Sequence, residues 1–240
     1  LTNSAIKGKP DIEWVDLTSR LAELNDILEV TTKPIIYDGD TGGPAEHFAL
    51  MTRTLERLGV SAVAIEDKIG LKRNSLLGSE AGQLQDSPES FCHKIQMGKQ
   101  ARVTGEFMIF ARIESLILGK GQADALRRAA AYAEAGADGV LIHSRAADPD
   151  EVLAFCAEYR RQGLAAPLIA VPTTYCQIRE SQLQEAGVRI AIYANHLLRA
   201  AFPAMRRAAE SILRHGRALE SEEEGASIAD IFDFIPEGAP

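Results

Sequence analysis

The feature of this chain that most limits its fold is an alternation of short apolar runs with longer amphipathic segments. Six runs have the length and composition of buried strands of a parallel sheet, and they lie at residues 34–37, 62–65, 107–111, 139–142, 168–171 and 189–193. Segments with helical periodicity are found at residues 16–29, 45–58, 88–103, 123–135, 149–161, 180–186 and 197–215. Repeated strand–helix units predict a parallel sheet with right-handed crossovers.

Polar residues follow most of the predicted strands. They are Asp38 and Asp40, Glu66 and Lys68, Arg112 and Glu114, His143 and Ser144, and Asn195 and His196. In a (β/α)₈ barrel such strand ends converge on one face, where the active site lies. An open doubly wound sheet usually has a glycine-rich phosphate loop after its first strand, and no such motif occurs here. We therefore expect an α/β chain with a TIM-type (β/α)₈ barrel. Because a barrel needs eight strands, its first one or two are expected to be missing before Leu1.

The stretch Asp38-Gly-Asp-Thr-Gly-Gly suggests a metal site at the end of the first predicted strand. Side chains alternate along a strand, so Asp38 and Asp40 would point the same way if the extended conformation persists. Two neighbouring carboxylates repel each other unless a cation lies between them, and Mg²⁺ or Mn²⁺ prefers such oxygen ligands. The alternative is a polar loop that caps the next helix. Taken alone, the stretch leaves both open.

Composition excludes several other classes of function. A formal net charge of -8, with no clustered Lys/Arg stripe, argues against a nucleic-acid partner. No apolar run reaches the ~18 residues of a membrane span, and no signal peptide is recognisable. The three cysteines, Cys92, Cys156 and Cys176, lack metal-site spacing and are expected to be reduced thiols of a cytoplasmic protein.

The candidate residues together predict an enzyme. Singly, Arg112 would be an ion-pair partner and His143 a core histidine. Acids, an arginine, a lysine and a histidine on one barrel face instead suit a Mg²⁺-dependent enzyme with a small phosphorylated or carboxylated substrate. The long polar stretch 69–86 is expected to be a lid or binding loop. Residues 1–218 would form the catalytic domain, and residues 219–240 an acidic linker with a short helix.

The motifs also resemble a known family. Glu66-Asp67-Lys68-x-x-x-Lys72-x-Asn74-Ser75-Leu76, with the Asp38-Gly-Asp40-Thr-Gly stretch before it and Ala111-Arg112-Ile-Glu114 and His143-Ser144 after it, resembles the phosphoenolpyruvate mutase family of the isocitrate lyase superfamily. The resemblance runs from Leu1 to about His215. It implies interconversion of phosphoenolpyruvate and phosphonopyruvate, the step that makes the C–P bond of natural phosphonates.

The resemblance also implies a role for individual residues. Asp38 would ligate Mg²⁺, with Mn²⁺ as a substitute, and Asp40 and Glu66 would act largely through metal-bound water. Asp11 matches a further acid that matters for catalysis. The remaining matches are substrate-binding residues Arg112, His143 and Leu1, and the lid residues Lys72, Asn74, Ser75 and Leu76.

Rival functions remain open at this point. Phosphonopyruvate hydrolase shares nearly all the motifs but typically has threonine where Asn74 stands, so the asparagine favours the mutase. Lyases of the superfamily use a lid cysteine, and no cysteine lies between Glu66 and Gln85. A non-catalytic anion- or metal-binding barrel would not need all the acids together with Lys72. The resemblance further implies a homotetramer, a dimer of dimers, that exchanges its terminal helix between subunits.

Overall fold

The fold is organised on a curled parallel sheet. The computed structural model describes residues 2–70, 72–77 and 82–234. In these residues, the main sheet has six strands in the order β1-β2-β5-β6-β7-β8. Their bounds are β1 Ile36–Asp38, β2 Ala62–Glu66, β5 Met108–Ile113, β6 Gly139–Ile142, β7 Leu168–Ala170 and β8 Val188–Ala191. All neighbouring pairs are parallel, which confirms the predicted α/β architecture of the barrel type.

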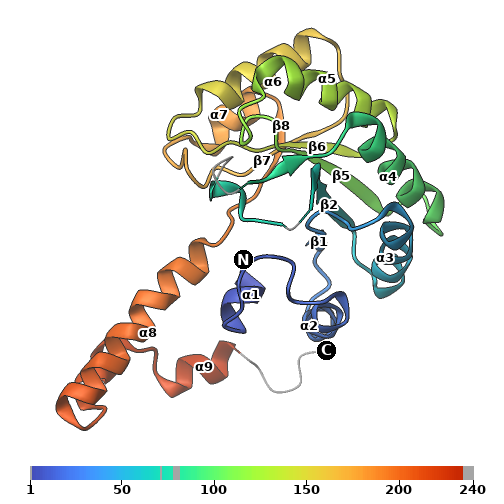
Figure 1. Ribbon diagram of the computed structural model, residues 1–240. Coiled ribbons are helices and arrows are strands. Elements are labelled where there is room, and N and C mark those ends of the chain that lie inside the picture. Colours follow the sequence, from blue (N-terminus) through green and yellow to red (C-terminus); the bar gives the residue numbers. More distant parts are fainter. Residues whose placement is uncertain (1, 71, 78–81, 235–240) are drawn as a thin grey trace.

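Helices cover one face of this sheet (Figure 1). They are α3 Ala45–Leu58, α4 Pro88–Ala101, α5 Gly121–Glu134, α6 Asp150–Arg161 and α7 Glu180–Glu185. Local signals explain several helix ends. Asp16 accepts a hydrogen bond from the backbone of Ser19 at the start of α2 (Leu17–Val30), and Ser87 caps α4 in the same way. Gly59 ends α3 in the left-handed conformation that glycine adopts readily.

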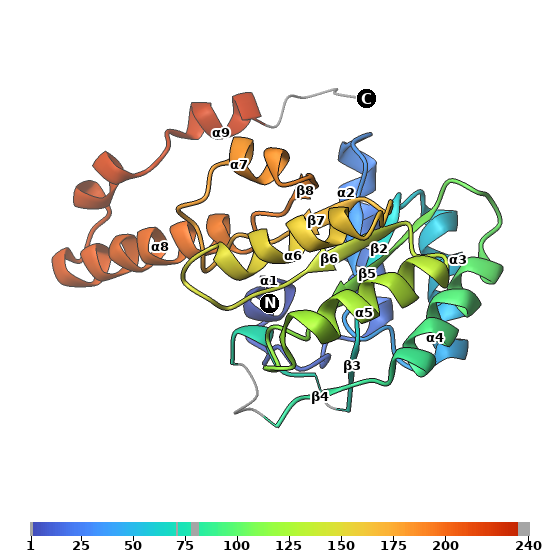
Figure 2. The same cartoon turned by 90° about the horizontal axis from the view of Figure 1, so that it is seen from above.

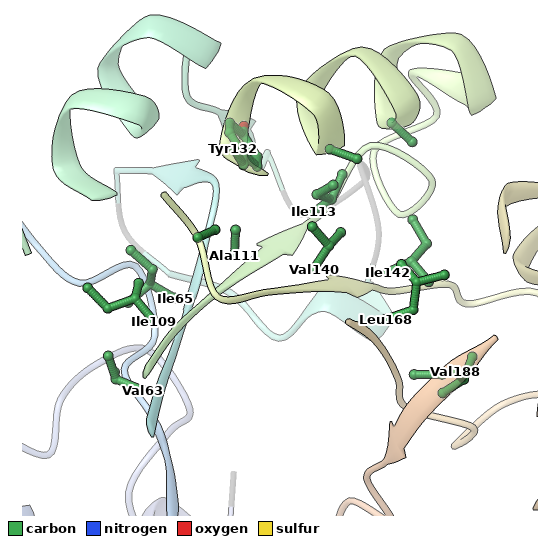
Figure 3. Packing of buried hydrophobic residues seen from close by; sticks show 14 of the residues in the cluster. Val63, Ile65, Ile109, Ala111, Ile113, Tyr132, Val140, Ile142, Leu168 and Val188 are labelled. Carbon is green, nitrogen blue, oxygen red and sulfur yellow. The ribbon is translucent and has the colours of Figure 1, made fainter. Parts of the chain in front are cut away.

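Strand alternation separates the core into two layers. Val63 and Ile65 of β2 point toward the helices and belong to the large core cluster (Figure 3), whereas Ala62 and Ala64 belong to a small cluster on the other face. Strands β5 and β6 follow the same rule, and Phe110 and Leu141 face inward with the two alanines. The inner face of the curled sheet is therefore apolar near the middle of the strands.

The stretch 69–86, expected to be a lid or binding loop, begins and ends as a hairpin. Strand β3 (Lys68–Ile69) pairs with β4 (Leu84–Gln85) in an antiparallel manner, and a 3-10 turn, η1 (Ser75–Leu77), lies between them. Two-residue strands carry too little periodicity to be recognised from sequence. We keep the name lid for the described residues 69–70, 72–77 and 82–86.

The described chain begins with a helix at residues for which the sequence predicts no helical segment. This helix is α1, Thr2–Ile6. Tertiary contacts stabilise this short helix, because Lys7 after it pairs with Glu23 of α2 at 2.7 Å. Isolated helices of this length are not stable in water.

The last helices project from the body. Figures 1 and 2 both show α8, His196–His215, extending away from the sheet, with α9, Ile228–Phe234, following it. The acidic run predicted as a linker contains a 3-10 helix, η3 (Leu219–Glu224), and Arg207 of α8 pairs with Glu224 at 3.2 Å. None of the described helices is long and apolar enough to cross a membrane.

Candidate active site

A cavity of about 640 Å³ lies on the inner face of the sheet, at the carboxyl ends of its strands. Its wall combines apolar residues of the strands with polar residues from strand ends, from α1 and α2, and from the lid. The polar and charged lining residues are Thr2, Asn3, Asp11, Arg20, Asp38, Lys72, Asn74, Ser75, Arg112, His143, Thr173 and Asn195. The predicted convergence of strand-end residues on one face is thus confirmed for Asp38, Arg112, His143 and Asn195.

Strand alternation explains how three of these residues reach the cavity. Arg112 lies two positions after the inward-facing Phe110, and His143 lies two positions after the inward-facing Leu141. Asp38 follows Ile36 on β1 by the same interval, and both line the cavity. Because side chains two apart on a strand share a face, the apolar middle of the sheet gives way to charged groups at its carboxyl edge.

The sequence suggested that Asp38 and Asp40 share a face by strand alternation, but in the structure they do not. The strand ends at Asp38, and Asp40 has a φ of 53°, so the extended conformation does not persist. Asp40 instead faces α2, where Arg20 Nη1 donates to its Oδ2 at 2.7 Å. A nearby glycine makes this turn possible, because a Cβ on Gly39 would lie 2.8 Å from Val63 Cγ2.

Lys72 is a lid residue whose ammonium group places positive charge near both acids. It is hydrogen-bonded to Asp40 Oδ1. Desolvation opposes ionisation of Asp38, but Lys72, Arg112 and Arg20 lower its pKa. Desolvation and the Asp38 charge raise the pKa of Asp40, against the effect of Lys72 and Arg20. This is the pattern of two close carboxylates that need a cation between them.

Arg112 is held by a second group of buried side chains. Its Nε donates to Glu114 Oε1 at 2.6 Å, and its Nη2 lies 2.6 Å from Ser75 Oγ and 2.9 Å from His143 Nδ1. Desolvation opposes ionisation of Glu114, but Arg112 and His143 hold its pKa well below the usual range. Burial and the Arg112 charge lower the pKa of His143, so its imidazole is neutral near pH 7.

The lid brings an amide to the rim of the cavity. Asn74 Nδ2 donates to Asp11 Oδ2 at 3.0 Å, and Asp11 Oδ1 lies 3.5 Å from Lys72 Nζ. Ser75 contacts Arg112, and Leu76 also lines the cavity. The sequence-predicted lid residues therefore lie together, over the strand-end residues.

Glu66 lies behind the wall of the cavity. It is 1% exposed and pairs with Lys68 at 3.1 Å and with Arg112 at 3.3 Å. Neither of its oxygens accepts a hydrogen bond from another described residue. Burial raises the pKa of Glu66 to about 7, although Arg112 and Lys68 act against it. Leu1, also expected at the site, lies outside the described residues.

The donor set fits a hard divalent cation. Asp38 offers carboxylate oxygens at the cavity, and Asp40 lies beside it with its oxygens paired to the cationic groups of Arg20 and Lys72. The Glu66 oxygens pair with Lys68 and Arg112 but accept no hydrogen bond from the described residues. Within the described part of the chain, no three Asp, Glu, His or Cys side chains converge closely enough to hold an ion by themselves. Mg²⁺ is commonly bound by one or two carboxylates with water completing its shell, and Asp38 and Asp40 suit that arrangement.

Two charged residues have contacts that were not predicted from the sequence. Arg20 contacts Asp40 and stacks over Tyr37 at 4.4 Å, but it belongs to a helix without a recognisable motif. Lys68, 2% exposed, was predicted at a strand end but without a contact to the lid. Its Nζ donates to Ser75 Oγ at 2.9 Å and to Gln83 Oε1 at 2.6 Å, both in the lid. Its position beside Glu66 in the motif was the one available signal.

The fold and the cavity together define a barrel-type α/β enzyme with a charged site at the carboxyl ends of its strands. The family model described as phosphoenolpyruvate phosphomutase matches residues 1–213. The chain belongs to this family.

Curated relatives and solved structures agree with this assignment. The chain is 35% identical to phosphoenolpyruvate phosphomutase of Tetrahymena pyriformis, over 97% of this chain and 76% of that protein. It is 37% identical to phosphonopyruvate hydrolase of a Variovorax strain, over 96% of this chain and 79% of that protein. The crystal structure of phosphoenolpyruvate phosphomutase from Streptomyces platensis superposes with a TM-score of 0.91, at 39% identity, and covers 97% of this chain and 79% of that one.

Proposed function

We propose that this protein is a Mg²⁺-dependent phosphoenolpyruvate mutase that interconverts phosphoenolpyruvate and phosphonopyruvate. The observation that carries the proposal is the position of Asn74, whose amide is held at the cavity by Asp11. Identity to relatives does not separate mutase from hydrolase, because both occur at similar identity. The lid asparagine favours the mutase, because the resemblance implies threonine at this position in the hydrolase. No cysteine is available in this segment for lyase chemistry.

The reaction needs positioning more than proton transfer. The C3–P bond of phosphonopyruvate breaks and a P–O bond to the enol oxygen forms, with no net change in protons. The transferred group spreads its negative charge over its oxygens in a loose transition state. The guanidinium of Arg112 and the neutral imidazole of His143 can donate hydrogen bonds to those oxygens or to the substrate carboxylate.

Charge on the pyruvate part requires a cation. Asp38 would hold Mg²⁺ directly, and Asp40 and Glu66 would do so through water. The ion would supply positive charge next to the enolate and carboxylate oxygens of the substrate. The Lys72 ammonium also offsets part of the carboxylate charge.

The lid has the task of excluding water. A transferred phosphoryl group that meets water becomes inorganic phosphate. Asn74 and Ser75 supply donors over the cavity, and as an amide and a hydroxyl they do not themselves abstract protons at neutral pH.

Phosphorus NMR with phosphonopyruvate and Mg²⁺ tests the proposal. A growing phosphoenolpyruvate signal supports the mutase. Inorganic phosphate with pyruvate would make the protein a hydrolase. An unchanged spectrum at high protein concentration would contradict both activities. A chelator added to a reacting sample should stop turnover, and added Mg²⁺ should restore it.

We also propose that the protein is a homo-oligomer, a tetramer built from dimers, with α8 at an interface. None of the side chains of α8 is buried in the described chain. Phe202 and Met205 are each 60% exposed and Leu213 is 85% exposed. An exposed apolar stripe of this kind is typical of a surface that another subunit covers.

A further inference from the structure

Arg128 is a buried charged residue of α5 to which the proposed chemistry assigns no role. It is 6% exposed. Its Nη1 donates to Asp67 Oδ2 at 3.1 Å and to the backbone carbonyl of Asp86 at 2.8 Å, and its Nε donates to Asp124 Oδ2 at 2.8 Å. Asp67 lies where the chain enters the lid hairpin, and Asp86 lies where it leaves. One guanidinium group therefore holds both stems of the lid.

Other buried groups complete the network around Asp67. Tyr132 Oη accepts a hydrogen bond from Arg128 at 2.8 Å and donates to Asp67 Oδ2 at 2.7 Å. Gln85 Nε2 donates to the same oxygen at 2.9 Å. Asp67 and Tyr132 are fully buried. Three donors from two elements thus converge on one carboxylate oxygen.

The same carboxylate is bonded to the wall of the cavity. Asp67 Oδ1 accepts the backbone N–H of Glu114 at 2.9 Å, and the N–H of Asp67 donates to the carbonyl of Arg112 at 3.1 Å. The N–H of Asp86 donates to the carbonyl of Asp67 at 2.9 Å. The stems of the lid are therefore joined to the strand end that carries the substrate-binding arginine.

We propose that Arg128 is a positioning residue that sets where the lid lies over the cavity. It acts through Asp67 and Asp86, and so places Asn74 and Ser75 opposite Arg112. The inference rests on the proposed function in one respect, which is that the lid takes part in catalysis. A guanidinium group offers donors in a fixed planar arrangement, which suits bonds to two chain segments at once. Removing this guanidinium also leaves the buried Asp67 carboxylate without one of its partners and so lowers stability. The test must therefore separate the position of the lid from the stability of the whole protein.

The test replaces Arg128 by methionine, which keeps the length of the side chain and removes its donors. Trypsin cleavage after Lys72 or Arg73 reports how often the lid leaves its position. We expect Arg128→Met to raise this rate by about tenfold or more, because local opening becomes easier when buried hydrogen bonds are lost. The kcat for phosphonopyruvate should fall by roughly 10²-fold, the effect of a misplacement of about 1 Å, with KM changed less. The share of inorganic phosphate among the products should rise.

Two further variants separate positioning from general stability. Arg127→Met is the matched control, because Arg127 is the neighbouring residue on α5 and its side chain is 65% exposed. It should keep the wild-type cleavage rate and product ratio. Arg128→Lys retains the charge but lacks the planar fork, so it should give intermediate values for both. Tyr132→Phe removes only the hydroxyl group, and it replaces Arg128→Met in the cleavage test if that variant does not fold.

The outcomes are decisive for the role of Arg128. A cleavage rate that rises more in the lid than at the other trypsin sites of the same variant supports it. Lid cleavage equal to that of Arg127→Met overturns it, as does cleavage that rises equally at all sites in Tyr132→Phe. The proteolysis result stands by itself if wild-type protein proves inactive, since that result would count against the proposed function alone.

Discussion

The contact between Asn74 and Asp11 joins residues that are 63 positions apart in the chain. Neither side chain is fully buried, so each can exchange its partner for a substrate group when one enters the cavity. The amide donates, and the Asp11 carboxyl group accepts most strongly while it is ionised. Desolvation opposes that form, but the Lys72 charge and the Asn74 hydrogen bond lower the pKa of Asp11. At neutral pH the contact is therefore maintained.

Replacing Asn74 by alanine should cut mutase turnover by roughly 10²-fold or more, the effect of one lost transition-state donor. Asn74→Thr should raise hydrolysis relative to isomerisation. The measurement is the ratio of inorganic phosphate to phosphoenolpyruvate formed from phosphonopyruvate. Leu77→Ala is a control on the same segment, since Leu77 is 57% exposed. If Asn74→Ala isomerises phosphonopyruvate at the wild-type rate, Asn74 has no part in the reaction.

The two strand-end acids should respond differently to metal. Asp38→Ala should abolish turnover at any practical Mg²⁺ concentration, because a direct ligand is lost. Asp40→Ala should be partly rescued by raised Mg²⁺ or by Mn²⁺, because it would act through water. Initial rates against metal concentration provide the measurement, with the exposed Asp26→Ala as a control. Near-normal activity in both variants would show that the metal site lies elsewhere.

At the scale of elements, close helix packing supports the strands that carry the site. Helices α3 and α4 lie side by side on the sheet (Figure 1), and Gly98 of α4 faces Phe48 of α3. A Cβ at Gly98 would lie 2.3 Å from Phe48 Cε1 and 2.8 Å from Ile109 Cδ1. Both neighbours are fully buried, so neither can move aside freely.

Gly98→Ala should therefore destabilise the protein. Alanine gains about 1 kcal/mol of helix propensity over glycine, while overpacking costs about 1–3 kcal/mol. We expect the second effect to be larger, for a net loss of about 1 kcal/mol. Denaturant unfolding measures it. Gly105→Ala is the control, because a Cβ there has no described atom within 4 Å. Equal midpoints for the two variants would contradict the tight contact.

At the scale of the whole molecule, α8 is the element that the rest of the chain leaves uncovered. We expect light scattering on a sizing column to give an oligomer at micromolar concentration. Phe202→Glu should shift it toward monomer, because a charge would enter the apolar stripe. Ser211→Glu adds the same charge roughly 180° away around the helix and should leave the oligomer unchanged. A monomeric wild-type protein would contradict the proposal.

The order of strands and helices could be predicted from the sequence because hydrophobic periodicity is local. The same local pattern placed Asp38, Arg112 and His143 at strand ends, and the parallel sheet then brought them to one edge. Two-residue strands such as β3 and the helix α1 escaped prediction. Their stability comes from contacts rather than from pattern.

Sequence by itself determined which residue types meet at the carboxyl edge of this protein's sheet, since side-chain alternation needs no knowledge of distant neighbours. Only the tertiary structure decided how those residues are held. Arg20 on Asp40, Lys68 beneath the lid and Arg128 between its two stems are contacts between segments that are separate in the chain. Such contacts form only when the sheet curls and α5 packs on it, because buried charges require partners that the local sequence does not specify.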